Sequence, residues 1–189
     1  GLLEDISKFV EFVVRNRREG IFDVGSGILC SIQELIMVLE NDVLKYKIDI
    51  VPGSFIEEEK SKLYNTAYYI DSSGKIKSRY RKINLWLPER RYLTAGNKIS
   101  VFNTRYGKVG LIICWDLIFP EIFRKMVKMG VDIVICPSYW CYGDAGRGIK
   151  LDRNSEIKLV DSLCIGRAFE NEVIFVYCNS AGKLEVGKI

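Results

Sequence analysis

The sequence predicts an α/β protein built from layers of sheet and helix. Its second half contains two strand–helix–strand units, in which short apolar runs alternate with segments of helical periodicity. The preceding part contains short apolar runs separated by turn residues, which is typical of antiparallel strand pairs. Hydrophobic residues make up 48% of the 189 residues, enough for the core of one soluble domain. We therefore expect a single domain over residues 1–189.

Two amphipathic helices are expected within the first 49 residues. Apolar residues recur at helical spacing over 4–18, with charged residues on the opposite face, and Gly20 follows as a typical helix stop. Ser31 and Glu34 form a capping-box pattern at the start of a second helix over 31–44. The glycine-rich segment between these two helices fits neither the helical nor the strand period clearly.

Turn residues divide the rest of the chain into expected elements. The Asp71–Gly74 segment separates two strand patterns and predicts a hairpin, and Tyr106 and Gly107 predict a second turn. Pro120 lies where the first turn of a helix accepts proline. We expect strands at 48–55, 63–70, 75–83, 99–104, 109–114, 131–137 and 172–179, helices at 119–129 and 154–169, a charged turn at 57–62 and a glycine-rich loop at 143–148.

The composition excludes several kinds of chemistry. The chain has no histidine, which removes Ser–His–Asp and Cys–His catalysis and the commonest protein ligand of metals. The spacing of the cysteines matches no zinc site. The cysteines are Cys30, Cys114, Cys136, Cys141, Cys164 and Cys178. Any hydrolysis must therefore depend on lysine, cysteine, serine, tyrosine and carboxylate groups.

Charge and hydropathy argue against two classes of partner. The net charge of +4 is small, and basic residues are scattered among acidic ones, so we expect no nucleic-acid surface. No segment approaches the roughly 20 apolar residues of a membrane span. The first five residues lack the basic start of a signal peptide. These patterns predict a cytoplasmic protein without membrane or nucleic-acid partners.

Cys114 is the first candidate for a chemical role. It ends an apolar strand pattern, and a helix pattern starts a few residues later at Phe119. Ligands of open α/β sheets bind at the carboxyl ends of strands, where free backbone N–H groups can hold an oxyanion. A nearby helix start also favours the thiolate. The alternative is a buried small residue, because unpaired cysteine is often buried.

Lys82 is the second candidate, because it ends a strand pattern and precedes an apolar run. Burying an unpaired ammonium costs roughly several kcal/mol, so a lysine in this setting is unusual. Beside a cysteine, it would lower the thiol pKa and could hydrogen-bond an oxyanion. Taken alone, the position also fits a strand-end lysine whose ammonium reaches solvent.

Several short motifs occur in one order and at characteristic spacings. They are 64–67 (YNTA), 80–83 (YRKI), Glu89, 107–110 (GKVG), 113–116 (ICWD), 119–121 (FPE), 137–140 (PSYW), 167–171 (RAFEN) and Asn179. This set resembles the nitrilase superfamily, whose members hydrolyse amides, nitriles or carbamoyl groups. The resemblance is strongest over residues 50–182. It implies a four-layer α-β-β-α sandwich that usually forms dimers and uses no metal or cofactor.

The resemblance also implies roles for individual residues. Cys114 matches the nucleophile, which forms a thioester that water then hydrolyses. Lys82 matches the lysine that stabilises the tetrahedral intermediate, and Glu89 matches a second glutamate that orients the site. The backbone N–H of Trp115 would complete the oxyanion hole. Two further aromatic residues, Tyr139 and Trp140, would line the substrate pocket.

The sequence departs from the superfamily pattern in its first 49 residues. The family has a glutamate general base in a Pro-Glu pair at the end of an early strand, and this part of the chain contains no proline. The nearest counterpart is the 20–25 segment, which offers Asp23 instead. Asp23 is one methylene shorter than glutamate, and a displacement of about 1 Å can reduce a rate about a hundredfold. The family's glutamate base therefore has no identified counterpart in this part of the chain, and Asp23 is the candidate that the 20–25 segment offers in its place.

The ends of the pattern are also incomplete. The opening strand of the family fold and its last two strands have no counterpart, so we expect a sandwich truncated at both ends. Bare sheet edges in such a fold predict association or poor stability. The resemblance implies a homodimer or higher homo-oligomer.

Two functions follow, and a third is weak. The first is hydrolysis of a non-peptide carbon–nitrogen bond in a small linear amide, or less readily in a nitrile or carbamoyl compound, through a cysteine thioester. The second is a catalytically inactive relative that acts as an interaction module, which the missing glutamate would explain. A redox role for Cys114 lacks a resolving cysteine nearby in the sequence.

Overall fold

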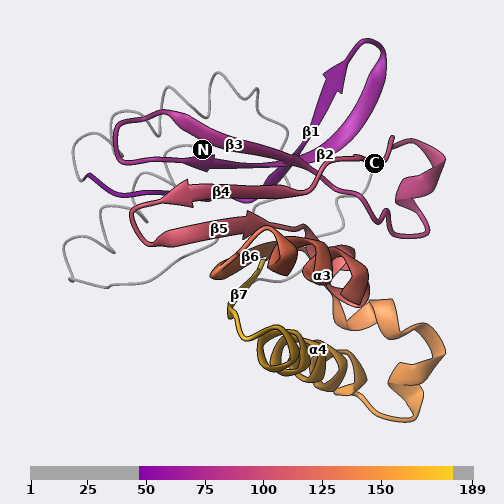
Figure 1. The fold of residues 1–189 in the computed structure, drawn as a ribbon. Helices are drawn as coiled ribbons and strands as arrows, with labels where there is room; N and C mark the ends of the chain where they lie inside the picture. The colour runs from indigo at the N-terminus through magenta and orange to yellow at the C-terminus, as the bar shows by residue number, and fades with distance from the viewer. Residues whose placement is uncertain (1–46, 181–189) are drawn as a thin grey trace.

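The computed structural model describes residues 47–180. In this part of the chain, two sheets pack against each other and two helices cover the outer side of the second sheet (Figure 1). The two helices expected at 4–18 and 31–44, and Asp23 between them, lie outside the described residues. The α/β fold class is confirmed, and three of the four expected layers lie in the described part.

The first sheet is antiparallel and has the order β1-β2-β3. Its strands are β1 (Ser54–Glu59), β2 (Lys62–Ile70) and β3 (Ile76–Arg81). The predicted hairpin between β2 and β3 is confirmed. Its turn is closed by the Asp71 carboxylate, which accepts hydrogen bonds from the backbone N–H groups of Ser73 and Lys75 at 2.9 and 3.1 Å. This is the local hydrogen bonding that makes aspartate a frequent turn residue.

The prediction for β1 was wrong in its position. A strand was expected at 48–55 and a charged turn at 57–62, but the strand begins at Ser54 and continues through Glu59. The acidic residues of β1 are paired across the sheet. The Glu57 carboxylate accepts hydrogen bonds from Tyr68 on β2 and from the Arg81 guanidinium on β3, the latter at 3.1 Å. Cross-strand pairs of this kind stabilise a sheet. In the sequence alone, the same run of charged residues suggested a turn.

The second sheet has the order β4-β5-β6-β7 and is mixed. Its strands are β4 (Ser100–Thr104), β5 (Gly107–Leu111), β6 (Ile133–Ser138) and β7 (Ile174–Asn179). The β4–β5 pair is antiparallel, whereas β5, β6 and β7 run parallel. Helix α3 (Pro120–Lys128) connects β5 to β6, and α4 (Ser155–Asn171) connects β6 to β7. The two predicted strand–helix–strand units are confirmed, and the carboxyl ends of three parallel strands meet at one edge of the sheet.

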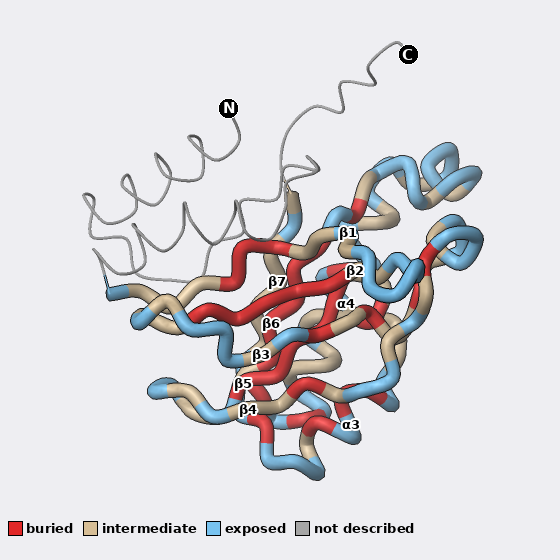
Figure 2. Tube along the Cα trace, turned by 90° about the horizontal axis from the view of Figure 1, so that it is seen from above, coloured by how far each residue is buried: buried red, intermediate tan, exposed pale blue. Residues whose placement is uncertain are grey.

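The core lies between the two sheets and beneath α3. The Tyr69 ring on β2 meets the Phe102 ring on β4 edge-on, with centroids 5.0 Å apart. On the helical side, Phe123 of α3 packs against Phe175 of β7 at 5.7 Å. The buried residues are concentrated in β2, β5 and β6, and the loop ends are exposed (Figure 2). Helix α4 buries only Val160 and Asn171, and its Phe169 remains 86% exposed.

Three short 3-10 helices shape the loops of the described part of the chain, residues 47–180. They are η1 (Glu89–Arg91), η2 (Cys114–Ile118) and η3 (Tyr142–Lys150). The segment expected to be a glycine-rich loop at 143–148 is therefore helical, with a break at Gly146, whose φ is 54°. A 3-10 turn needs few residues and tolerates glycine at such a break, so glycine content alone did not reveal it.

Arg167 joins α4 to the end of η2. Its guanidinium donates hydrogen bonds to the carbonyl oxygens of Leu117 and Ile118 at 3.2 and 2.9 Å. Hydrogen bonds from a charged donor contribute about 1.5–3 kcal/mol each. We expect Arg167→Ala to lower the free energy of unfolding by about 2–3 kcal/mol in urea titrations. The exposed Arg153→Ala control should stay within about 0.5 kcal/mol of the parent, and equal values for the two variants would contradict this role for Arg167.

Candidate active site

Cys114 lies just beyond β5, at the edge of the sheet where the parallel strands end. The strand was expected to reach Cys114, but it ends at Leu111, and Cys114 is the first residue of η2. Cys114 has a φ of 46°, in the left-handed region. This conformation costs about 1–3 kcal/mol for a residue other than glycine and persists only where neighbouring structure enforces it. The strained turn ends the strand and holds the thiol at the sheet edge.

The thiol of Cys114 has both apolar and polar surroundings. Its sulfur donates to the Tyr139 carbonyl oxygen, which lies 3.9 Å away just after β6. Burial raises the pKa of the Cys114 thiol, while the nearby Lys82 ammonium and the Ser138 hydroxyl act in the opposite direction. Because the net direction is upward, the thiol needs a base to become a nucleophile at neutral pH.

Lys82 and Glu89 form a buried ion pair near this thiol. Lys82 is 2% exposed, and its Nζ donates to the Glu89 carboxylate at 2.6 Å. Glu89 also accepts hydrogen bonds from the Trp86 backbone N–H at 2.7 Å and from the Asn65 side-chain amide at 3.2 Å. Three donors therefore fix the carboxylate, and the carboxylate in turn fixes the ammonium. The structure brings together Cys114, Lys82 and Glu89, which the sequence placed 32 and 7 residues apart.

The backbone around Lys82 is equally constrained. The Lys82 N–H donates to the Asn65 carbonyl oxygen, and the Gly96 N–H donates to the Lys82 carbonyl oxygen, both at 2.8 Å. A Cβ atom at Gly96 would lie 2.2 Å from the carbonyl oxygen of Arg81, so only glycine allows this approach. Strand β2 and the segment after η1 thus hold Lys82 from both sides.

Asp116 is a buried group that the sequence did not identify. Its side chain is 0% exposed and accepts four hydrogen bonds. The donors are the Tyr80 hydroxyl at 2.8 Å, the Asn84 backbone and side-chain N–H groups at 2.8 and 2.9 Å, and the Ile113 N–H at 3.0 Å. Burial raises the pKa of this carboxyl, and the hydrogen bonds oppose that rise. An acid two residues after a strand-end cysteine was the available signal.

The three aromatic candidates take different positions. Trp115 and Trp140 pack together with ring centroids 5.5 Å apart and planes at 40°. Trp140 is 7% exposed, and its backbone N–H donates to the Asn179 side chain at 2.8 Å. Tyr139 is 57% exposed and contributes its carbonyl oxygen, rather than its ring, to the surroundings of the thiol of Cys114.

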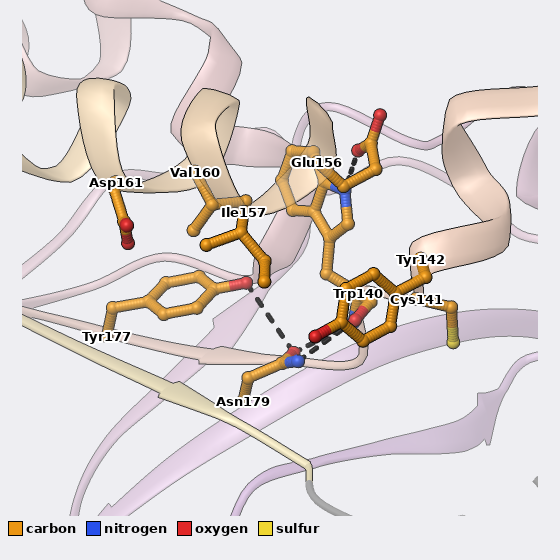
Figure 3. A pocket seen from close by; sticks show the side chains of 9 residues that line it. All are labelled: Trp140, Cys141, Tyr142, Glu156, Ile157, Val160, Asp161, Tyr177 and Asn179. Carbon is orange, nitrogen blue, oxygen red and sulfur yellow. Dashed lines mark hydrogen bonds between the residues drawn. The ribbon is translucent and has the colours of Figure 1, made fainter. Parts of the chain in front are cut away.

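A cavity of about 210 Å³ lies between α4 and the carboxyl ends of β6 and β7 (Figure 3). It is lined by Trp140, Cys141, Tyr142, Glu156, Ile157, Val160, Asp161, Tyr177 and Asn179. The indole N–H of Trp140 donates to Glu156 at 2.5 Å, which fixes one wall. Trp140 therefore does line a pocket, although Cys114 is not among the lining residues of this one.

Residues 47–180 contain neither a cluster suited to a metal ion nor a helix suited to a membrane. This part of the chain contains no group of three or more histidine, cysteine, aspartate or glutamate residues that could hold a metal ion. No helix among the same residues is long and apolar enough to cross a membrane.

The two packed sheets and the helices that cover the second sheet define an α/β protein. The chain belongs to the carbon-nitrogen hydrolase family, whose family model matches residues 37–188. The chain resembles the crystal structure of Saccharomyces cerevisiae Nit3, a member of branch 10 of the nitrilase superfamily. That likeness has a TM-score of 0.77 at 23% identity, covering 98% of this chain and 71% of the other. The expected family and fold are thereby confirmed.

Two curated relatives match this chain over only part of their own length. A probable nitrilase of Schizosaccharomyces pombe is 32% identical over 146 residues, which cover 76% of this chain and 49% of the relative. The 2-oxoglutaramate amidase of Bacillus subtilis is 33% identical over 146 residues, which cover 76% and 52%. The chain therefore spans about half the length of the curated relatives that it matches.

Proposed function

We propose that this protein hydrolyses a non-peptide carbon–nitrogen bond of a small linear amide through a thioester on Cys114. The carrying observation is the thiol of Cys114, held on a strained turn beside the buried Lys82–Glu89 pair. The 2-oxoglutaramate amidase among the relatives supports an amide, and nitriles or carbamoyl compounds are the less favoured substrates.

In the acylation step, a base takes the thiol proton and the Cys114 sulfur attacks the carbonyl carbon. The oxygen becomes an oxyanion, which the Lys82 ammonium and the Trp115 backbone N–H stabilise. Trp115 lies in the first turn of η2, where backbone N–H groups have no hydrogen-bond acceptor within the helix. The carbon–nitrogen bond then breaks, the nitrogen takes the proton from the base, and ammonia leaves.

In the second step, the same base takes a proton from water, and the resulting hydroxide attacks the thioester. The carbon–sulfur bond breaks, a carboxylic acid leaves and the thiol is restored. Glu89 keeps the Lys82 ammonium in place through both steps by its 2.6 Å contact. We propose Asp23 as the base. Loss of both acyl-adduct formation and turnover in Asp23→Asn, measured by mass spectrometry and acid release, would support this assignment, and unchanged turnover would refute it.

The proposed function can be tested by intact mass spectrometry. The protein is incubated with short amides and nitriles, and its mass is followed over time beside Cys114→Ala. A control is Cys141→Ala, because Cys141 is another partly exposed cysteine in the loop after β6. We expect an adduct of acyl mass on the parent and on Cys141→Ala, and none on Cys114→Ala.

The outcomes separate the two functions that the sequence leaves open. An adduct that disappears as acid accumulates supports the amidase, and its mass identifies the acyl group. A folded sample that forms no adduct with any compound sinks the proposal and favours an inactive interaction module.

A further inference from the structure

Asp116 has no part in the proposed chemical steps, yet it is the most fully bonded buried carboxylate near the site. We propose that Asp116 is a positioning residue that fixes the distance between Cys114 and Lys82. It hydrogen-bonds to residues that flank Lys82 and to the residue that precedes Cys114. The inference deepens the proposed function and rests on it for its effect on turnover.

The first half of the argument concerns the turn that carries Cys114. The Ile113 N–H donates to the Asp116 carboxylate at 3.0 Å, and the Asp116 N–H donates to the Ile113 carbonyl oxygen at 3.0 Å. Asp116 therefore closes the turn twice, with Cys114 between the two bonded residues. A φ of 46° at Cys114 requires such enforcement, because a cysteine does not adopt it freely.

The second half concerns the segment that carries Lys82. The other oxygen of Asp116 accepts from the Asn84 N–H at 2.8 Å and from its side-chain amide at 2.9 Å. The Tyr80 hydroxyl donates to the carboxylate at 2.8 Å. Tyr80 and Asn84 lie two residues before and two residues after Lys82, so the same carboxylate holds both flanks of the lysine.

The chemistry of the group fits this purpose. A backbone N–H and a side-chain amide N–H can only donate, so an ionised carboxylate, which only accepts, satisfies its neighbours. A carboxylate that is 0% exposed is costly to bury, and apolar side chains could have filled the same volume. One carboxylate that links two segments 32 residues apart supplies a constraint that apolar packing does not.

The test compares Asp116→Asn with Asp132→Asn. Asp132 accepts a hydrogen bond from the Lys108 N–H at 2.8 Å at the opposite end of β5 and β6, away from the site. Fold is checked by near-ultraviolet circular dichroism. Acylation is measured with the amide that labels the parent, and the reactivity of the thiol with iodoacetamide is measured across pH. The second readout needs no substrate.

We expect Asp116→Asn to acylate about a hundredfold more slowly with little change in KM, since a displacement of about 1 Å has that effect. The midpoint of alkylation should rise by about one pH unit, because the thiol moves away from the Lys82 ammonium. Loss of a negative charge without displacement would lower that midpoint instead. A fall, or values equal to those of Asp132→Asn, would overturn the proposal.

Two smaller changes cover the case in which Asp116→Asn does not fold. Tyr80→Phe and Asn84→Ala each remove one donor and leave the carboxylate in place. Each should slow acylation several-fold and raise the alkylation midpoint, and parent-like values in both would overturn the proposal. If the parent forms no adduct with any amide or nitrile, the proposed function fails, while the alkylation midpoints still decide whether Asp116 positions the thiol.

Discussion

Lys82→Ala is expected to reduce acylation about 100- to 1000-fold or more, the loss seen when one donor of an oxyanion hole is removed. The reason lies in the position of Lys82, which is buried, paired with Glu89 at 2.6 Å and close enough to influence the Cys114 thiol. Without the ammonium, the thiol loses a positive charge that lowers its pKa, and the proposed intermediate loses a hydrogen-bond donor. The measurement is the rate of acyl-adduct formation by intact mass spectrometry.

The same variant should keep its fold, which circular dichroism can confirm. The Lys82 backbone still bonds to Asn65 and Gly96, and Glu89 keeps its donors from Trp86 and Asn65. Lys62→Ala is the matched control, because Lys62 is an exposed lysine at the start of β2. The Lys62→Ala variant should acylate at the rate of the parent. Normal thioester formation by Lys82→Ala would contradict the role of the lysine.

The sequence predicted the fold well where hydrogen bonding is local. The hairpin turn at Asp71 and the helix start at Pro120 depend on residues within a few positions, so their signals are present in the sequence. The strand at 54–59 was misplaced because the partners of Glu57, which are Tyr68 and Arg81, lie 11 and 24 residues away. Strand propensity is a property of single residues, so it cannot predict that a charge will be neutralised by a residue on another strand.

The candidate site shows the same division. Cys114 and Lys82 were singled out because each ends a strand pattern, and the order and spacing of the surrounding motifs supplied their expected roles. The sequence alone gave no reason to expect four hydrogen bonds at Asp116, because its donors come from Tyr80, Asn84 and Ile113 on two separate segments. Tyr139 was expected to offer its ring, but the side chain is 57% exposed and the carbonyl oxygen is the contacting group. A contact made by a backbone carbonyl group cannot be predicted from the identity of the side chain.

Glu89 illustrates why stability and chemistry must be measured separately at this site. The carboxylate stabilises a buried ammonium, which is a contribution to folding, and it also holds that ammonium beside Cys114, which is a contribution to the proposed reaction. Breaking a buried ion pair by removing one partner costs about 3–5 kcal/mol, whereas replacing both partners with uncharged groups of similar volume is often neutral. The pair can therefore be divided experimentally.

We expect Glu89→Ala to lower the free energy of unfolding by about 3 kcal/mol, because it leaves the Lys82 ammonium buried without its counter-ion. The Lys82→Met/Glu89→Gln double variant should recover most of that stability, because it buries neither charge. Its acylation rate should stay as low as that of Lys82→Ala, since the double variant also lacks the Lys82 ammonium that is proposed to stabilise the oxyanion. Urea denaturation gives the stabilities, and adduct formation gives the rates. A double variant that recovered both would mean that the ion pair supports only the fold, and the catalytic role proposed for Lys82 would then be wrong.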